Sequence, residues 1–285
     1  MFKHGKKLLV NGDFAVPKDD SEERAISALC PLNDLIDTKR VWKPKFANLA
    51  SFRVVLVPRG HHLVVCKRDA RHFFHALRIG RKWQKYMAHP PVDSRLGDAA
   101  GLYPLHCSTP MGFTCSAAWA QGYNETVAER CALPPSQRLV AGVPPPKAPP
   151  FWGSILDDFW TVEAVADSPA DVNAPADSGA EWGRPLLEKV GNLLEQDGIR
   201  VNSKKDVWND DSAEVQGAML DGRELWIGAS RPKRWLLLQA GLDICSRRYV
   251  RVRLLQRFVG NVFLTVFRHM HSGSFRRSLS LDSVL

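Results

Sequence analysis

The chain has 285 residues, a length that predicts one large domain or two ordinary ones. Hydrophobic residues make up 45% of it, which is enough for a substantial core. The net charge of +9 indicates a polyanionic partner, and it is concentrated: 12 Lys/Arg face 3 Asp/Glu from Arg223 onward, while the rest is balanced.

Several classes are excluded. The basic first 11 residues hold too short an apolar run for a signal peptide. No run approaches the ~18 apolar residues of a membrane span, so no membrane association is expected. Six cysteines without a CxxC pair fit free thiols in a reducing compartment, which predicts a cytoplasmic or nuclear protein. The group at positions 61, 62, 66, 72 and 75 (four His and one Cys) matches no structural zinc spacing.

The first third of the chain contains one predicted strand and one isolated acid. Residues 1–22 are polar and predict a poorly ordered N-terminus. Residues 63–66 predict a short buried strand. From Lys67 to Lys85 seven Lys/Arg surround a single acid, Asp69. A carboxylate ringed by cations at a strand end suits a metal or phosphate site, and the alternative is a surface salt bridge.

The middle of the chain is organised around a pair of acids. Residues 109–116 predict a turn, and 117–121 a helix that Thr114 or Ser116 could cap. A proline-rich connector, 134–150, leads to two apolar runs that predict a hairpin with Asp157 and Asp158 at its turn. Oxygen ligands suit Mg²⁺, so this tip is a candidate metal site; the alternative is an ordinary Asp-rich turn.

The last third alternates between loops and regular elements. Residues 163–183 predict a flexible acidic insertion, and 185–196 an amphipathic helix that Gly198 ends. Strands are expected around 215–220 and 225–228. A final helix carries an apolar stripe from Leu254 to Phe267 and several arginines. It is too charged to span a membrane, and we expect it to pack on a core with a basic face outward.

Seven segments then follow one another in a specific order: 24–33, 69–75, 110–121, 155–158, 198–205, 216–217 with the following strand, and 255–260. In this order they resemble the fingers segment, the first to fourth motifs, the primer-grip hairpin and the thumb-side helix of retroelement reverse transcriptases, including those of retrotransposons with long terminal repeats. Each motif is weak alone, but the ordered set covers roughly residues 20–280 and is specific.

The resemblance implies an α+β, right-hand polymerase fold with an antiparallel palm sheet, helices, fingers and a partial thumb. It assigns 23–62 to partial fingers, 63–228 to the palm with the insertion at 163–183, and 229–285 to a basic segment like a thumb or connection. The implied activity is that of an RNA-directed DNA polymerase, which transfers deoxynucleotides to a primer 3′ end on an RNA or DNA template.

The resemblance also implies roles for residues. Asp69 and Asp157 would ligate two Mg²⁺ or Mn²⁺ ions and Asp158 would support the first, while Lys205 would be a general acid. The deoxynucleoside triphosphate would meet Arg24, Ala70, Phe74, Met111 and Gly112, with Phe74 selecting the sugar. Nucleic acid would contact Gln121, Gln216, Gly217, Arg251, Arg253 and Arg257.

The sequence departs from the family at several positions. Ile155 replaces the usual aromatic residue, Met111 replaces a common Gln or Phe, and Ala28 and Cys30 stand where the fingers often carry charges. No segment like RNase H or integrase follows, which fits a fragment or a minimal polymerase. The alternative function is a non-catalytic nucleic-acid-binding remnant; a third is an RNA-making palm polymerase, against which Phe74 argues.

Overall fold

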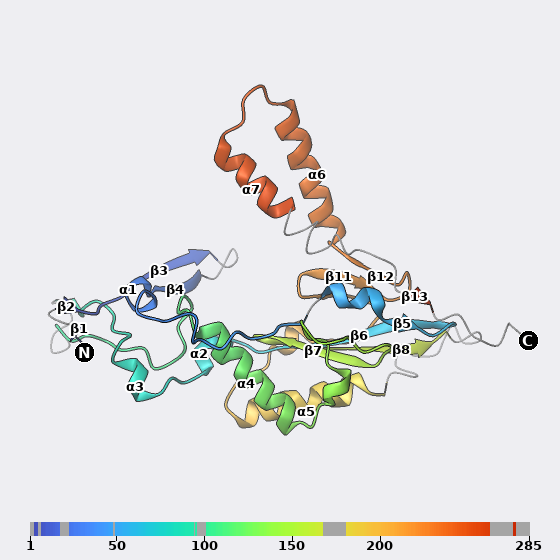
Figure 1. The fold of residues 1–285 in the computed structure, drawn as a ribbon, viewed down its shortest axis with the longest axis horizontal. Helices are drawn as coiled ribbons and strands as arrows, with labels where there is room; N and C mark the ends of the chain where they lie inside the picture. The colour runs from blue at the N-terminus through green and yellow to red at the C-terminus, as the bar shows by residue number, and fades with distance from the viewer. Residues whose placement is uncertain are drawn as a thin grey trace, which may run out of the picture. The chain divides into compact units, whose positions relative to one another are not determined.

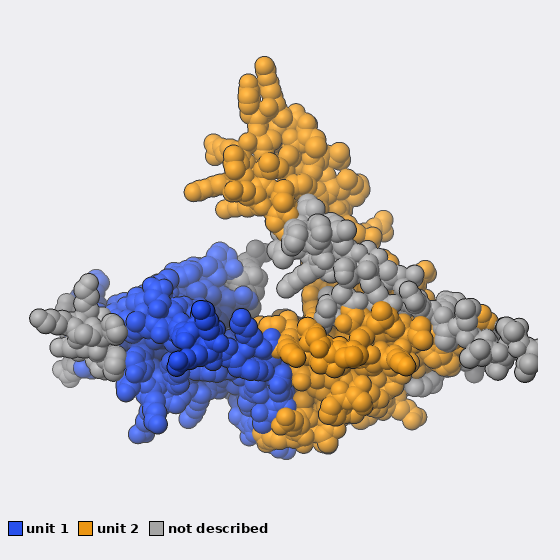
Figure 2. All heavy atoms as spheres, in the orientation of Figure 1, with its two compact units in different colours: residues 1–44, 70–127, 193–201 blue, residues 45–69, 128–192, 202–285 orange. Residues whose placement is uncertain are grey.

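The computed structural model describes residues 3–4, 7–17, 23–47, 49–93, 95, 101–167, 181–262 and 276–277. These residues fall into two compact units (Figure 2). Unit 1 contains Met1–Pro44, Ala70–Val127 and Leu193–Val201, and unit 2 contains Lys45–Asp69, Ala128–Asn192 and Asn202–Leu285.

Unit 2 is built on an antiparallel sheet whose strand order is β7-β8-β6-β9. Figure 1 labels β6, β7 and β8 of this sheet. The strands are β6 (His61–Asp69), β7 (Phe151–Ile155), β8 (Asp158–Ala166) and β9 (Val207–Asp210). Their β-branched and aromatic residues suit a buried pleated surface. The strand expected at 63–66 is confirmed and longer. The predicted insertion at 163–183 begins too early, because β8 continues to Ala166 and pairs with β6 along its length. Residues 168–180 of this insertion lie outside the described part.

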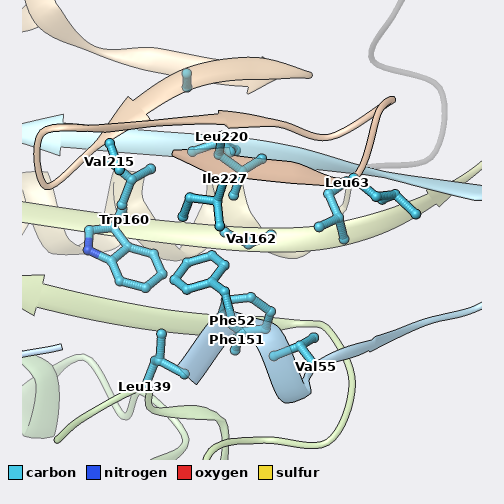
Figure 3. Close-up of a cluster of buried hydrophobic side chains, with 14 of the residues drawn as sticks. Phe52, Val55, Leu63, Leu139, Phe151, Trp160, Val162, Val215, Leu220 and Ile227 are labelled. Carbon is cyan, nitrogen blue, oxygen red and sulfur yellow. The ribbon is translucent and has the colours of Figure 1, made fainter. Parts of the chain in front are cut away.

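A second sheet, β10 (Ser212–Val215), β11 (Ala218–Asp221) and β12 (Trp226–Gly228), confirms the strands expected at 215–220 and 225–228. Between the two sheets lies the main core, to which the 3₁₀ helix η1 (Leu49–Val54) contributes Phe52 (Figure 3). Phe52 meets Phe151 edge-on, at 5.2 Å between ring centroids, and Trp160 at 5.6 Å. The amide of Leu63 donates to the carbonyl of Gly222, 3.0 Å away, and joins the sheets directly.

Helix α5 (Gly183–Gln196) packs on β6 and β8. Two glycines permit the approach: a Cβ on Gly183 would lie 2.4 Å from the Thr161 hydroxyl, and one on Gly191 would lie 1.9 Å from the Arg68 guanidinium. Leu187, Val190 and Leu194 are buried, as the helical spacing predicts. Gly198 follows with φ +82°, which confirms the predicted stop.

Unit 2 also contains two helices in the C-terminal segment, α6 (Arg231–Ser246) and α7 (Val252–Val262), which contact each other. Helix α6 was not predicted. Helix α7 lies within the predicted final helix, but the expected packing on a core is wrong for the described residues, because Leu254, Leu255 and Val259 are 39%, 45% and 54% exposed. The stripe beyond Val262 lies outside the described part. A short strand, β13 (Arg276–Arg277), pairs with β5 (Leu56–Val57).

Unit 1 has short strands and helices around its own core. It contains β1 (Lys3–His4), β2 (Lys7–Leu8), β3 (Gly12–Pro17), β4 (Glu23–Ala28), α1 (Cys30–Asn33), α2 (Phe73–Ala76), α3 (Arg81–Gln84) and most of α4 (Ser116–Arg130). The described part of residues 1–22, for which we expected little order, thus includes strands. The core packs Leu29, Met87 and Phe113 against Trp83 and Trp119.

Helix α4 confirms and extends the helix expected at 117–121. Of the two residues proposed as its cap, Ser116 donates its hydroxyl to the Pro110 carbonyl at 2.7 Å. That hydrogen bond closes the preceding turn. Ser116 is the first residue of α4, so it belongs to the helix and does not precede it as a cap would.

Candidate metal centre

Asp69, Asp157 and Asp158 lie together within unit 2, and one carboxylate oxygen of each lies within 4.8 Å of the others. Asp69 is the last residue of β6 and Asp158 the first of β8, and the two are direct partners across the strand pair. Asp157 precedes β8 in the hairpin turn. The strand register therefore brings together three acids that two distant segments of the chain supply.

The hairpin turn differs by one residue from the prediction. Ile155 pairs with Asp158, so the turn residues are Leu156 and Asp157 rather than the two acids. Leu156 has φ +51°, a left-handed conformation that costs a branched residue roughly 1–3 kcal/mol. Tight hairpin turns require such a conformation. The consequence is that Asp157 sits at the tip while Asp158 is fixed by the sheet.

The three carboxylates are largely buried, and burial and mutual proximity disfavour the charged forms of Asp157 and Asp158. Asp69 is 8% exposed. Burial raises the pKa of Asp157, and the neighbouring Asp69 adds to the effect. Burial, opposed by Lys67 and reinforced by Asp157 and Asp69, raises the pKa of Asp158 to about 6. Acids with raised pKa values that are gathered in one place are typical of functional sites.

Three cationic or amide groups of unit 2 contact the acids. Lys67 Nζ lies 3.3 Å from Asp158 Oδ2, and Lys205 Nζ lies 3.5 Å from Asp69 Oδ2. The Asn202 amide donates to Asp69 Oδ2 at 3.0 Å. Lys205 was predicted as a site residue, whereas Lys67 and Asn202 were not. The signal for Lys67 was its place two residues before Asp69, because alternate residues of a strand share a face.

One atom tests whether a divalent cation fits this centre. Asp158 Oδ1 is buried and has no hydrogen-bond partner among the described residues. A buried carboxylate oxygen without a partner is costly, and a cation would satisfy it. Mg²⁺ and Mn²⁺ prefer carboxylate oxygens, so the donor set of three acids suits either ion.

The predicted nucleotide-contacting residues lie in unit 1. Arg24 is exposed on β4. The Ser27 amide of the same strand donates to the carbonyl of Met111 at 2.9 Å. Gly112 has φ +111°, and a Cβ there would lie 2.2 Å from the Ser27 carbonyl oxygen, so the motif needs glycine at this position. The structure thus places the 110–112 turn against the strand that carries Arg24.

Two further predicted nucleotide contacts, Ala70 and Phe74, follow Asp69 in the chain. Ala70 is buried and pairs with Val201. Phe74 is half-buried on α2. Its neighbour Phe73 is buried, and their ring centroids are 6.2 Å apart. Phe74 is therefore the more accessible of the two rings, as a contact to a sugar requires.

The predicted nucleic-acid contacts have unequal exposure. Gln121 is 0% exposed inside α4, so its side chain offers no surface to a nucleic acid in this structure, contrary to our expectation. Gln216 and Gly217 form the β10–β11 turn, with φ +52° and +80°. Arg251, Arg253 and Arg257 are exposed at α7. The arginines and Gly217 are accessible, whereas Gln216 is half-buried, with its side-chain amide beside the Ala47 carbonyl and the Trp160 indole.

Comparisons with known proteins place the fold. The sequence matches no protein-family model and no curated protein. The structure is similar to a foamy viral protease-reverse transcriptase dRH in complex with double-stranded DNA, with a TM-score of 0.58 and 16% identity over 88% of this chain and 35% of that one. It also resembles the foamy viral protein in complex with an RNA/DNA hybrid (TM-score 0.58, 15% identity, 90% and 27% covered) and with double-stranded DNA (0.54, 15%, 95% and 54%).

The fold is therefore like that of a reverse transcriptase, with mixed helices and antiparallel sheets. The chain spans between about a quarter and about half the length of these structures. Among the described helices, none has both the length and the apolar character needed to cross a membrane.

Proposed function

We propose that this chain holds the polymerase core of an RNA-directed DNA polymerase, with palm, partial fingers and thumb in the right-hand arrangement. The observation that carries the proposal is the convergence of Asp69, Asp157 and Asp158 at the meeting of a strand end and a hairpin turn. The similarity to solved reverse transcriptases supports it. The partners are a primer–template and deoxynucleoside triphosphates.

The three acids would hold two Mg²⁺ or Mn²⁺ ions, with Asp69 and Asp157 ligating both and Asp158 supporting one. Bound in this way, such ions supply charge stabilisation for phosphoryl transfer and lower the pKa of the attacking 3′-hydroxyl. The three acids must be deprotonated to bind these ions. Asn202 orients Asp69 through its amide, and the β6–β8 register fixes Asp158.

Two lysines contribute charge beside the acids. Lys67 neutralises Asp158 in the free chain, at 3.3 Å. Lys205, whose side chain is 63% exposed, can reach both Asp69 and solvent. We assign it the delivery of a proton to the pyrophosphate leaving group, since an ammonium on a flexible stem suits a general acid near developing negative charge.

The nucleotide side of the reaction falls to unit 1. Arg24 would bind the triphosphate, because a guanidinium matches phosphate oxygens. Ala70, Phe74, Met111 and Gly112 would shape the space around base and sugar. Phe74 would exclude a 2′-hydroxyl, and its partial exposure on α2 is compatible with that role.

The nucleic-acid duplex would be held through its phosphates. The Gln216–Gly217 turn would contact the primer, and Arg251, Arg253 and Arg257 the backbone, without reading sequence. The net charge of +9, concentrated in the C-terminal segment, supports this partner.

Primer extension on an RNA template with Mg²⁺ or Mn²⁺ tests the proposal. We expect the wild-type chain to add deoxynucleotides, and Asp157→Asn and Asp158→Asn each to reduce the rate at least ~100-fold, as loss of a charge-stabilising group does. Primer–template binding, measured by fluorescence anisotropy, should stay within about twofold, because these acids contact metal rather than duplex.

Asp93→Asn is the matched control, since this carboxylate lies on the surface and its partner among the described residues is nearby Arg95. It should extend primers like wild type. Extension at wild-type rates by both site variants would refute the assignment. Tight duplex binding by a wild type that extends nothing would favour the non-catalytic alternative.

A further inference from the structure

A second cluster of potential metal ligands lies in unit 1, beside Ser27 of β4. Asp13, His89 and His106 each present one ligand atom, and these atoms lie within 4.8 Å of one another. Asp13 is exposed and both histidines are half-buried. The proposed polymerase activity gives none of the three a role.

Backbone pairing holds the three residues in place. Val10 bridges Ala88 in parallel, and Ala88 bridges Leu105 in the antiparallel sense. The His106 amide donates to the Met87 carbonyl at 3.1 Å, and the Asn11 amide to the Ala88 carbonyl at 2.8 Å. Three chain segments, 10–13, 87–89 and 104–106, therefore run side by side and carry one ligand each.

The side chains are also oriented in advance. Asp13 and Ser27 are direct partners across the β3–β4 pair. Asp13 Oδ2 accepts a hydrogen bond from His89 Nδ1, and the Ser27 hydroxyl is hydrogen-bonded to His106 Nε2 at 2.9 Å. The two imidazole rings are 4.0 Å apart between centroids. One strand pair thus holds both rings, and the Ser27 contact to His106 is a type of support that metal-binding histidines commonly have.

The chemistry of the set favours a transition metal. Two imidazoles and one carboxylate suit Zn²⁺ and its neighbours better than Mg²⁺, which prefers oxygen alone. A neutral imidazole offers a ring-nitrogen lone pair to such an ion, and a carboxylate offers an oxygen. Three protein ligands leave a fourth tetrahedral position for water.

We propose that Asp13, His89 and His106 bind one Zn²⁺ ion, which ties segments 10–13, 87–89 and 104–106 of unit 1 together. The ion would bind His89 at the ring nitrogen that now contacts Asp13, with the ring hydrogen carried on the other nitrogen, so two bonds to the ion replace the Asp13–His89 hydrogen bond. The role is structural, and it is independent of the polymerase proposal. Zn²⁺ binding at this site can be confirmed or refuted without reference to primer extension.

Titration of the full chain with Zn²⁺ against a chromogenic chelator tests the site, with thermal unfolding as a second readout. We expect one tight equivalent and a higher Tm in the wild type. His89→Gln and His106→Gln should each weaken binding about 100-fold or more and abolish the rise in Tm. Asp13→Asn changes an exposed position, so this variant should fold and should bind Zn²⁺ more weakly. It tests the site even if a histidine variant fails to fold.

Two controls separate this site from others. His61→Gln changes a histidine of β6 that is hydrogen-bonded to the Arg59 carbonyl, and Asp157→Asn removes an acid of the other centre. Both should bind Zn²⁺ like wild type. X-ray absorption at the zinc edge should show nitrogen and oxygen neighbours only. Unchanged affinity in all three site variants, no bound Zn²⁺, or sulfur in the first shell would each overturn the proposal.

Discussion

Asp69 and Asp158 face each other directly across β6 and β8, so the register of one strand pair determines the geometry of the candidate metal centre. Strand side chains alternate between faces, and a slip of one residue would send one of the two carboxylates to the opposite face. The pairing continues to His61 and Ala166, and buried Val65 and Val162 hold it in the core. The packing of the core therefore determines the geometry of the site.

Removal of the Asp158 charge should stabilise the metal-free protein. The pKa of this acid is raised in the folded state to about 6, so the folded chain binds the proton more tightly than the unfolded chain does. Wild-type stability should therefore fall as the pH rises from about 4 to about 6, whereas Asp158→Asn is not subject to that loss. At pH 7 in chelator we expect a gain of ~1–2 kcal/mol, or a few degrees in Tm.

The measurement is thermal unfolding of both proteins from pH 4 to pH 8. The difference should shrink toward pH 4, and added Mg²⁺ should raise the Tm of the wild type alone. A variant less stable than wild type at pH 7 would show that the Lys67 contact outweighs burial.

Phe74→Val should relax the choice of sugar. A smaller side chain at this half-buried position removes the clash with a 2′-hydroxyl, so ribonucleotide incorporation relative to deoxynucleotide should rise ~10-fold or more. Steady-state incorporation of both nucleotide classes gives the ratio.

Its neighbour supplies the control. Phe73 is buried against Tyr123, with ring centroids 5.9 Å apart, so Phe73→Val should lower stability by ~1–3 kcal/mol and leave the ratio unchanged. An unaltered ratio in folded, active Phe74→Val would remove the sugar-selection role.

Arg251, Arg253 and Arg257 should determine the salt dependence of primer–template binding. The exposed guanidiniums would displace counterions from phosphates, so replacing all three with Gln should reduce the slope of log K against log salt by up to ~3. Anisotropy titrations across a salt series measure it. Lys39, Arg40 and Arg95 are exposed residues of unit 1 and provide a charge-matched triple variant, for which a clearly smaller change is expected. Equal slopes for wild type and the arginine variant would locate the duplex surface elsewhere.

Gly112→Ala should destabilise unit 1. The new methyl group would lie 2.2 Å from the Ser27 carbonyl oxygen in a left-handed backbone, which costs ~1–3 kcal/mol or more. Gly260→Ala is the control, because no other element of the described chain comes within 4 Å of a Cβ there and alanine favours a helix. Urea denaturation should show a loss for the first and none for the second. Equal midpoints would mean that the 110–112 turn moves without cost.

Some features were determined by local sequence. The apolar spacing that predicts α5 depends only on neighbours three and four residues apart, and Gly198 ends the helix through its own backbone freedom. The ordered motifs were enough to predict that Asp69, Asp157 and Asp158 converge, and the structure brings them together. The apolar runs around Asp157 likewise predicted the hairpin, because strand pairing next to a tight turn is a local event.

Other features were decided by tertiary structure alone, because they depend on contacts between segments that no spacing records. The register placed Leu156 rather than Asp158 in the turn. Packing buried Gln121 completely, while it left Leu254, Leu255 and Val259 of α7 exposed. The cluster of Asp13, His89 and His106 is the clearest case. Zinc ligands are recognisable in a sequence when they are close neighbours, whereas Asp13 and His89 are separated by 76 positions. They meet because the segment that leads into β3 pairs through its backbone with two loop segments.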